Sequence, residues 1–273
     1  MLKEKLSNLR QQAPLIHNIT NYVTVNDCAN ILLACGASPI MADDINEVAQ
    51  ITTICSGLNI NIGTLNSSTI ESMLVAGKKA NSLAHPVILD PVGAGASTLR
   101  TETACKLLRE VKFAVIRGNM SEIRTLALGS TASGGVDVDI CDMVSDETLD
   151  AAVLFAKSFA KQTGSVIAIT GAIDIVANEK SAYIIRNGDS MMSKVTGTGC
   201  MLSAMVAAYV CANKEDIIGA TAAAVCAMGI CGERAKQRLN PNEGNASLRN
   251  NIIDEIYNLD EEKLESGAKY DIR

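Results

Sequence analysis

A turn of threonines and glycines leads directly into a long apolar run in the second half of the chain. Residues 194–203 read KVTGTGCMLS. Glycines let successive backbone N–H groups point at one guest, and the first turn of a helix leaves further N–H groups unpaired at the positive end of its dipole. Such a turn attracts an anion, so Gly197 and Gly199 predict a phosphate-binding site.

Cys200 falls in the first turn of the helix that we expect after these glycines. The field of the helix favours the thiolate over the thiol, and a thiolate is the better base or nucleophile. A structural alternative remains open, because Gly-Thr-Gly before a helix is often a tight turn capped by threonine, and cysteine is commonly a small buried residue. The segment has neither the Gly-Lys-Ser/Thr ending nor the third glycine of the two best-known phosphate loops.

A carboxylate follows the apolar run of residues 87–89. Asp90 begins the segment DPVGAG. A carboxylate at the end of a strand could hold Mg²⁺ or its waters, and the glycines allow a ligand to approach the backbone closely. The alternative is a turn in which the aspartate accepts hydrogen bonds from nearby N–H groups.

An arginine follows the next apolar run, residues 113–116. Arg117 begins the segment RGNMSE, and its fork of donors suits the oxygens of a phosphate. Glu122 could lie in the outer shell of a metal ion. It also stands three residues after Asn119, which is the spacing of a helix capping box. Neither interpretation excludes the other.

A hydroxyl and an exposed N–H follow a third apolar run, residues 166–169, at Thr170 and Gly171. An ordinary turn is the structural alternative. An acid, an arginine, a threonine and an anion-binding turn nevertheless all stand where an open α/β sheet brings its strand ends together. Together they predict a site for a polyphosphate and a divalent ion.

The first forty residues offer neutral amides and an apolar wall. Residues 17–26 read HNITNYVTVN, and Asn21, Asn26 and Met41 could hold a small, weakly polar, uncharged substrate. His17 has no acidic or cysteine partner at metal-ligand spacing, so we expect a hydrogen-bonded structural histidine rather than a metal ligand.

Strands and helices alternate along the chain, which predicts a mostly parallel sheet with helices on both faces. We find no linker and no repeat, so one α/β domain over residues 1–273 is the simplest account. The expected strands are 15–19, 39–41, 58–62, 87–89, 113–116 and 166–169, with a hairpin formed by 173–176 and 181–186. The expected helices are 22–35, 48–53, 67–83, 101–110, one from 119, 147–162, two within 200–231, and 247–259.

The composition is that of a globular protein, with 48% hydrophobic and 20% charged residues among 273. A net charge of −6 without a basic run argues against nucleic-acid binding.

Nine scattered cysteines with no Cys-x-x-Cys pair suggest reduced thiols in the cytoplasm. Residues 1–14 lack the apolar segment of a signal peptide, and the charged residues 213–216 divide the most apolar region into two pieces too short to span a bilayer comfortably. The glycine-rich residues 129–135 predict a loop that could close over a ligand.

Four of these segments together resemble the hydroxyethylthiazole kinase family, whose members have the ribokinase-like fold. They are residues 18–26, 90–95, 117–122 and 195–200, and residues 41–44 extend the match. The resemblance implies a three-layer α/β/α fold. It also implies Mg²⁺-dependent transfer of the γ-phosphoryl group of ATP to the primary hydroxyl of 4-methyl-5-(2-hydroxyethyl)thiazole, a step of thiamine biosynthesis.

The resemblance assigns roles by matching positions. It implies that Arg117 and Thr170 contact ATP, that Met41 and Gly197 contact the thiazole, and that Asp90 and Glu122 lie in the magnesium and phosphate region. It also implies a homotrimer with active sites near subunit boundaries. The wider ribokinase-like group usually has aspartate where this chain has Cys200. Residues 244–248, GNASL, depart from the Gly-x-x-Ser-Phe of the family.

We hypothesise that Cys200 accepts the proton of the substrate hydroxyl and forms no covalent intermediate. Three other functions stay open: a related kinase acting on hydroxymethylpyrimidine, a thiol enzyme that uses Cys200 covalently without ATP, and a nucleotide-binding protein without catalysis. The last would leave the amide-rich residues 18–26 without a purpose.

Overall fold

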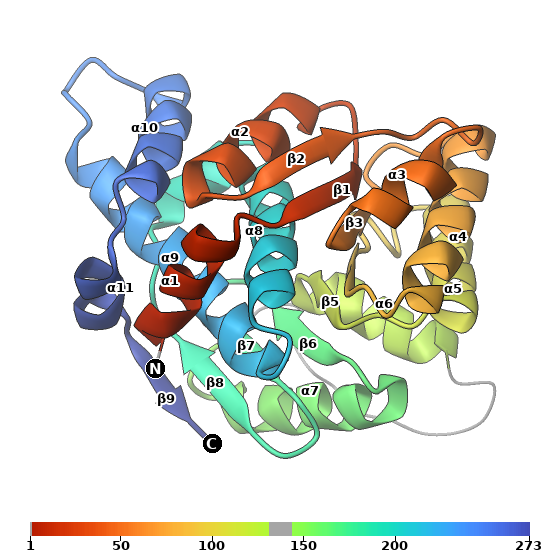
Figure 1. Ribbon diagram of the computed structural model, residues 1–273. Helices are drawn as coiled ribbons and strands as arrows, with labels where there is room; N and C mark the ends of the chain where they lie inside the picture. The colour runs from red at the N-terminus through yellow and green to blue at the C-terminus, as the bar shows by residue number, and fades with distance from the viewer. Residues whose placement is uncertain (1, 131–143) are drawn as a thin grey trace.

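The computed structural model describes residues 2–130 and 144–273, and a nine-stranded sheet runs through the described part of the chain (Figure 1). The strand order is β2-β1-β3-β4-β5-β6-β7-β8-β9. The pairings among β1 to β6 are parallel, whereas the pairings of β6 with β7, β7 with β8 and β8 with β9 are antiparallel. The strands are β1 (Leu15–Ile19), β2 (Ser38–Met41), β3 (Gly57–Asn61), β4 (Val87–Asp90), β5 (Val115–Gly118), β6 (Val166–Ile169), β7 (Asp174–Ala177), β8 (Ala182–Ile185) and β9 (Tyr270–Ile272).

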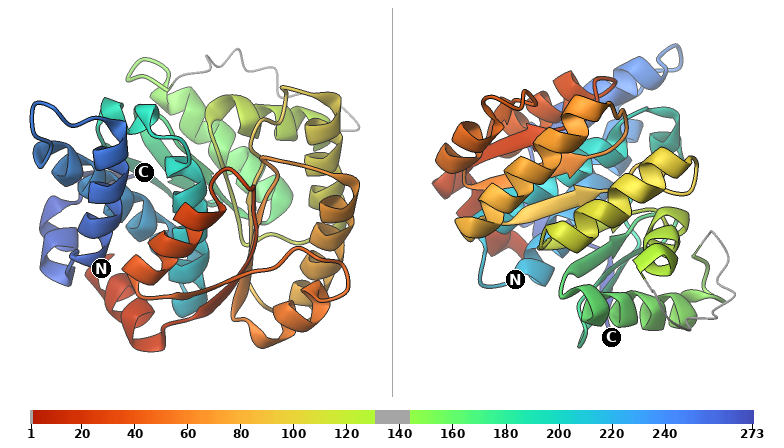
Figure 2. Two further views of the ribbon diagram at one scale, coloured as in Figure 1. Left: turned by 90° about the horizontal axis from the view of Figure 1, so that it is seen from above. Right: turned by 90° about the vertical axis from the view of Figure 1, so that its right-hand side faces the viewer.

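Helices cover both faces of this sheet, as Figure 2 shows, and each face has its own apolar core. One face carries α1 (Leu2–Gln12), α2 (Val25–Cys35), α8 (Thr198–Ala212), α9 (Ile217–Gln237), α10 (Asn245–Tyr257) and α11 (Glu261–Gly267). The other carries α3 (Val48–Ile54), α4 (Ser67–Ser82), α5 (Thr98–Glu110), α6 (Met120–Ser130) and α7 (Leu149–Thr163). The expectation of a three-layer, mostly parallel α/β/α fold is confirmed.

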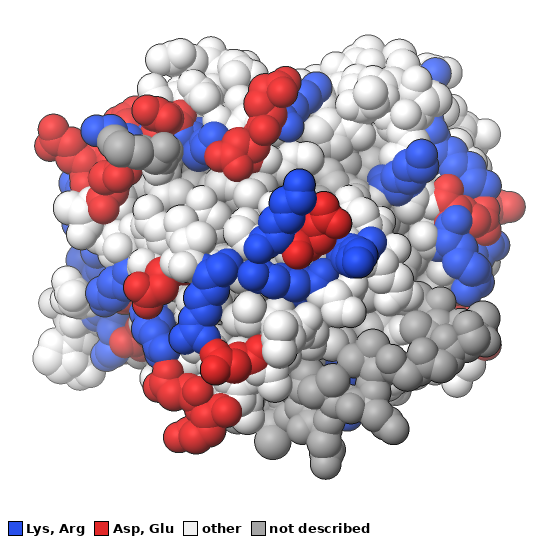
Figure 3. Space-filling view, turned by 90° about the horizontal axis from the view of Figure 1, so that it is seen from below, with Lys and Arg blue, Asp and Glu red and all other residues white. Residues whose placement is uncertain are grey.

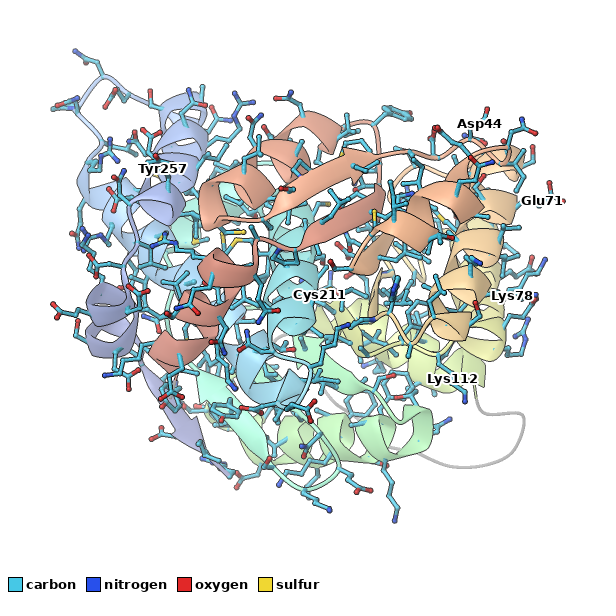
Figure 4. The ribbon with its side chains drawn as sticks, viewed as in Figure 1. Asp44, Glu71, Lys78, Lys112, Cys211 and Tyr257 are labelled. Carbon is cyan, nitrogen blue, oxygen red and sulfur yellow. The ribbon has the colours of Figure 1, made fainter. Side chains whose placement is uncertain are left out.

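Helix α8 is the central element of its layer. It packs directly on β1, β3 and β4, and α1, α2 and α9 surround it. Every residue from Cys200 to Ala212 is buried, which explains why this segment has no polar face. Figure 4 shows Cys211, near the end of α8, well inside the molecule, whereas Lys78, Lys112 and Glu71 lie at its periphery.

Most expected elements are present, with shifted ends. Helix α2 begins at Val25 rather than at Tyr22, and β5 begins at Val115 rather than at Phe113. The hairpin expected before the glycine-rich turn is present as β7 and β8. A short 3-10 helix, η1 (Ser190–Lys194), follows it. Helices α1 and α11 and strand β9 were not predicted, and the glycine-rich segment 129–135 lies mostly outside the described residues.

One helix in the described part of the chain, α9, is long and apolar enough to cross a membrane by length and composition alone. Helix α9 has 21 residues and extends to Gln237, whereas we expected the second apolar piece to end within residues 200–231. Of its most apolar window, 78% is buried inside the protein, where it packs against α8 and α10, so it is a core helix here. On the face shown in Figure 3, basic side chains are interspersed with acidic ones.

Candidate active site

The turn before α8 closes around two glycines. Gly197 has a φ of 91°, in the left-handed region, and a Cβ there would lie 2.6 Å from Cγ2 of Thr24. Gly199 lies in the first helical turn, and a Cβ there would lie 2.5 Å from Nη1 of Arg117. The missing side chains therefore allow a guanidinium to lie against the N-terminus of α8, where the helix dipole also attracts anions.

Arg117 links three strand ends. It lies in β5, and its Nη2 donates a hydrogen bond of 2.6 Å to Oγ1 of Thr170, which directly follows β6. Its Nη1 lies 3.6 Å from Oδ1 of Asp90 at the end of β4. Parallel strands end at the same edge of the sheet, so residues that are far apart in sequence converge on one point.

Asp90 is fully buried and only half satisfied. Its Oδ2 accepts hydrogen bonds of 2.8 Å from Nδ2 of Asn61 and from Oγ of Ser203. Its Oδ1 has no hydrogen-bond partner within the described residues. Burial raises the pKa of this carboxyl to about 6, although the charge of Arg117 opposes the shift. The free oxygen of a buried carboxylate is where a cation would bind.

Glu122 holds the turn after β4. Its Oε2 accepts from the N–H of Asn119 and the Asn119 side chain accepts from the N–H of Glu122, so the capping box is present. Its Oε1 accepts a hydrogen bond of 2.8 Å from the N–H of Gly93. The charge of Glu122 contributes to raising the pKa of Asp90.

Cys200 is buried one turn into α8. Nδ2 of Asn21 donates to its Sγ at 3.3 Å. Burial, followed by the charge of Asp90, raises the pKa of the thiol, while hydrogen bonds from Thr24, Asn21 and Asn61 oppose the shift. The expectation that the helix end favours a resting thiolate is therefore wrong, because the loss of solvation outweighs the donors around the sulfur.

A pocket of about 670 Å³ opens beside this cluster. Arg117, Thr170 and Gly199 line one end of it. The remainder is lined by residues after β6, between β8 and α8, and on α9, among them Asp174, Met192 and Met228. Burial raises the pKa of Asp174 to about 7, against the N–H of Gly171 and the charge of Arg117. A pocket lined by both apolar side chains and an arginine suits a nucleotide.

Comparison with known proteins gives a consistent result. A model of the hydroxyethylthiazole kinase family matches residues 6–262. A hydroxyethylthiazole kinase of Clostridium acetobutylicum is 69% identical over 271 residues, which cover 99% of each chain. One of Clostridium tetani is 47% identical over 264 residues, 97% of this chain and 95% of that one. The chain belongs to the hydroxyethylthiazole kinase family.

Solved structures agree with this family membership. The hydroxyethylthiazole kinase of Pyrococcus horikoshii OT3 superposes with a TM-score of 0.87 at 33% identity, over 100% of this chain and 98% of that one. A ribokinase-like superfamily protein of Enterococcus faecalis superposes with a TM-score of 0.60 at 13% identity, over 92% and 89% of the two chains, and supports the fold alone.

The residues expected to bind the thiazole do not all lie at the site of this kinase-family chain. Asn21 is buried beside Cys200, and Met41 ends β2 half-buried. Asn26 lies on the exposed side of α2 and accepts a hydrogen bond from Asn30. Its side chain therefore faces solvent rather than Cys200 within a single chain. His17 is a buried structural histidine, as expected, bonded to Thr52 and to the carbonyl oxygen of Ala42.

Sequence reasoning missed several residues that the fold brings to the site. Asn61 and Ser203 both bond Asp90, and Asp174 and Met192 line the pocket. Asn61 pairs with Asp90 on the neighbouring strand, and only the register of the folded sheet reveals this pairing. No local pattern marks Ser203 within an apolar helix.

Proposed function

We propose that this protein transfers the γ-phosphoryl group of ATP to the primary hydroxyl of 4-methyl-5-(2-hydroxyethyl)thiazole in thiamine biosynthesis. The observation that carries the proposal is the convergence of Cys200, Asp90 and Arg117 on the N-terminus of α8, in a chain so similar to kinases named for this substrate.

The nucleotide occupies the pocket beside α8. Arg117 and Thr170 contact its phosphates, and the N–H groups around Gly199 receive the transferring group. Phosphoryl transfer depends mainly on positioning and on stabilising charge that spreads over the phosphate oxygens. A guanidinium held by Thr170 against a helix N-terminus supplies both.

The donor set suits Mg²⁺ bound together with phosphate. The described residues contain no cluster of three acidic, cysteine or histidine ligands, but Mg²⁺ commonly takes one or two carboxylates and completes its shell with waters and phosphate oxygens. Oδ1 of Asp90, which accepts no hydrogen bond within the described residues and faces Arg117 at 3.6 Å, meets that requirement, with Glu122 nearby. When bound, the ion would neutralise charge on the phosphates. Asp90 would hold it, and Glu122 would hold its waters.

Cys200 acts on the acceptor. Its thiolate takes the hydroxyl proton as the acceptor oxygen bonds to the γ-phosphorus, the bond from that phosphorus to the β-phosphate oxygen breaks, ADP leaves, and no covalent intermediate forms. Because the resting thiol is protonated, it must ionise before it can act, and a base term of about 10²–10⁴-fold is the most that it adds to positioning and charge stabilisation. Asn21, Met41 and Gly197 line the space for the thiazole, and Asn26 would reach a substrate only from its exposed position.

A single experiment tests the reaction. The purified protein is incubated with Mg-ATP and the thiazole alcohol, and with Mg-ATP and hydroxymethylpyrimidine as a competing acceptor, and the phosphate esters are measured by mass spectrometry. The thiazole ester is the expected product. Formation of the pyrimidine ester alone, or of neither ester, would overturn the proposal.

We further infer one domain per chain, a cytoplasmic location and a homotrimer with active sites near its subunit boundaries. All cysteines in the described ranges are free thiols, which suits a reducing compartment. Large apolar side chains are exposed around α2 and α3, including Tyr22, Leu33 and Ile54, and such groups mark protein interfaces. Tyr22 directly follows Asn21, so a partner there would adjoin the active site.

A further inference from the structure

Asn61, the last residue of β3, is a buried amide that the proposed chemistry does not use. It is fully buried, and all of its hydrogen bonds go to residues of the site. Its Nδ2 donates to Oδ2 of Asp90 at 2.8 Å. Its Oδ1 accepts from Nδ2 of Asn21 at 3.0 Å and from the N–H of Gly63 at 2.9 Å. Asn61 also acts directly on Cys200, because its side chain lowers the pKa of that thiol by hydrogen bonding.

These contacts allow the amide of Asn61 one orientation. An ionised carboxylate only accepts hydrogen bonds and a backbone N–H only donates them. A flipped amide would place oxygen against Asp90 and NH₂ against the N–H of Gly63. Gly63 permits the approach, because a Cβ there would lie 2.9 Å from Oδ1 of Asn61.

Asn61 and Thr24 hold the two ends of the Asn21 amide. Because Asn61 presents an oxygen, Asn21 turns its NH₂ group toward Asn61. The N–H and the hydroxyl of Thr24 both donate to Oδ1 of Asn21 at 3.1 Å, which holds the other end of the same amide. The NH₂ group of Asn21 then also faces Sγ of Cys200 at 3.3 Å.

A neighbouring asparagine provides the contrast. Asn59 lies two residues earlier in β3, on the same face of the sheet, and is also fully buried. Its Nδ2 donates to Asn18 at 3.1 Å, and its Oδ1 has no partner in the described structure. Within the described structure, the hydrogen bond of Asn59 leads to Asn18 and away from Cys200, so Asn59 serves as a matched control.

We propose that Asn61 is a positioning residue for phosphoryl transfer. Asn61 aligns the amide of Asn21, so that N–H donors face the sulfur of Cys200 when the sulfur takes the proton of the substrate. This inference rests on the proposed kinase function. It assigns Asn61 an effect on turnover that passes through Asn21 and Cys200, with little effect on the nucleotide pocket.

A double-mutant cycle tests this route. We would measure kcat and the KM for ATP in the unmutated protein, Asn61→Ala, Cys200→Ala and the double variant, with Asn59→Ala as control. Asn61→Ala should lower kcat by about 10–100-fold, the usual effect of an outer-shell positioning group, and leave the KM for ATP within about threefold. In the Cys200→Ala background, its further effect should shrink to about twofold, because interactions within one network are not additive.

If the loss of kcat in the double variant equalled the product of the losses in Asn61→Ala and Cys200→Ala, the two residues would act independently, and the inference would be overturned. A KM for ATP that rises as much as kcat falls in Asn61→Ala would identify a merely structural residue and would also overturn it. So would losses in Asn59→Ala equal to those in Asn61→Ala. Asn61→Leu, which keeps a similar volume but removes both the donor to Asp90 and the acceptor, repeats the test if the alanine variant does not fold. Failure of both to fold counts against the inference. Absence of product from the unmutated protein would instead overturn the kinase proposal.

Discussion

Cys200 combines a proton-accepting role with a burial that opposes ionisation. Since burial raises the pKa of the thiol, little of it is ionised at neutral pH, and positioning carries most of the rate. Cys200→Ala should therefore lose about 10²–10⁴-fold in kcat while ATP still binds, as measured by steady-state kinetics and by calorimetry with ATP. Cys200→Asp should keep or raise kcat, because a carboxylate ionises without help from the helix. Turnover by Cys200→Ala equal to that of the unmutated protein would remove the base role.

Asp174 makes the stability of the fold depend on pH. Burial raises the pKa of its carboxyl from 3.8 to about 7. Between these values the folded chain binds more protons than the unfolded chain, so the free energy of unfolding falls as pH rises. Asp174→Asn keeps the acceptor for the N–H of Gly171 and cannot ionise. The Tm of Asp174→Asn relative to that of the unmutated protein should rise by about 6–12 °C between pH 4.5 and pH 8, because these two pKa values imply a change of about 3 kcal/mol in the free energy of unfolding.

Scanning calorimetry at the two pH values checks this prediction. Asp271→Asn, on the exposed strand β9, serves as the control and should show no such growth. An Asp174→Asn advantage that stays constant or shrinks with rising pH would mean that the carboxyl does not titrate in this range.

Among the elements, α1 stabilises the fold from a position remote from the chemistry. Its Leu6 and Leu9 are buried against α8, α9 and α11. Nε2 of Gln12 donates to the carbonyl oxygen of Ala212, at the end of α8 opposite to Gly199. The helix thus packs on the scaffold that carries the anion-binding turn, but not on the turn itself.

Leu9→Ala should lower the free energy of unfolding by about 2–5 kcal/mol, because it leaves a cavity in a closed core. The kcat of the folded protein should stay unchanged. Urea denaturation and steady-state kinetics measure the two effects, with the exposed Gln11→Ala as control. A fall in kcat without a loss of stability would place α1 in the catalytic machinery instead.

The sequence predicts strands better than it predicts chain ends. Strand β6 lies where its apolar run predicts it, since strands buried on both faces are marked by unbroken apolar residues. Helix α1 was missed although Leu2, Leu6 and Leu9 recur at helical spacing, because charged residues separate them. Strand β9 is short and exposed, and only its pairing with β8 identifies it.

The sequence predicts part of the site, because some of its residues directly follow apolar strands. Residues that follow a strand, such as Asp90, Arg117 and Thr170, can be located because topology brings strand ends together. Asn61 and Ser203 act through pairings between distant elements. The raised pKa of Cys200 depends on burial by the folded chain. Neither these pairings nor this shift in pKa leaves a local pattern in the sequence.

At the scale of the whole molecule, the open edge of the sheet at β2 and the exposed apolar side chains of α2 and α3 predict association. Light scattering on the purified protein should give three times the chain mass of 28.7 kDa. Leu33→Asp, which charges a side chain that is 57% exposed, should reduce this mass without unfolding the chain. A mass of one chain for the unmutated protein would contradict the trimer.

The packing of α1 also has a consequence for synthesis of the protein. Its partners α8, α9 and α11 all come from the last third of the sequence. While ribosomes translate the earlier part, the leucine stripe of α1 has nothing to cover it, and exposed apolar surface of this kind promotes aggregation. The nascent chain should therefore present α1 to chaperones until α9 has emerged, so that its first helix is among the last to dock.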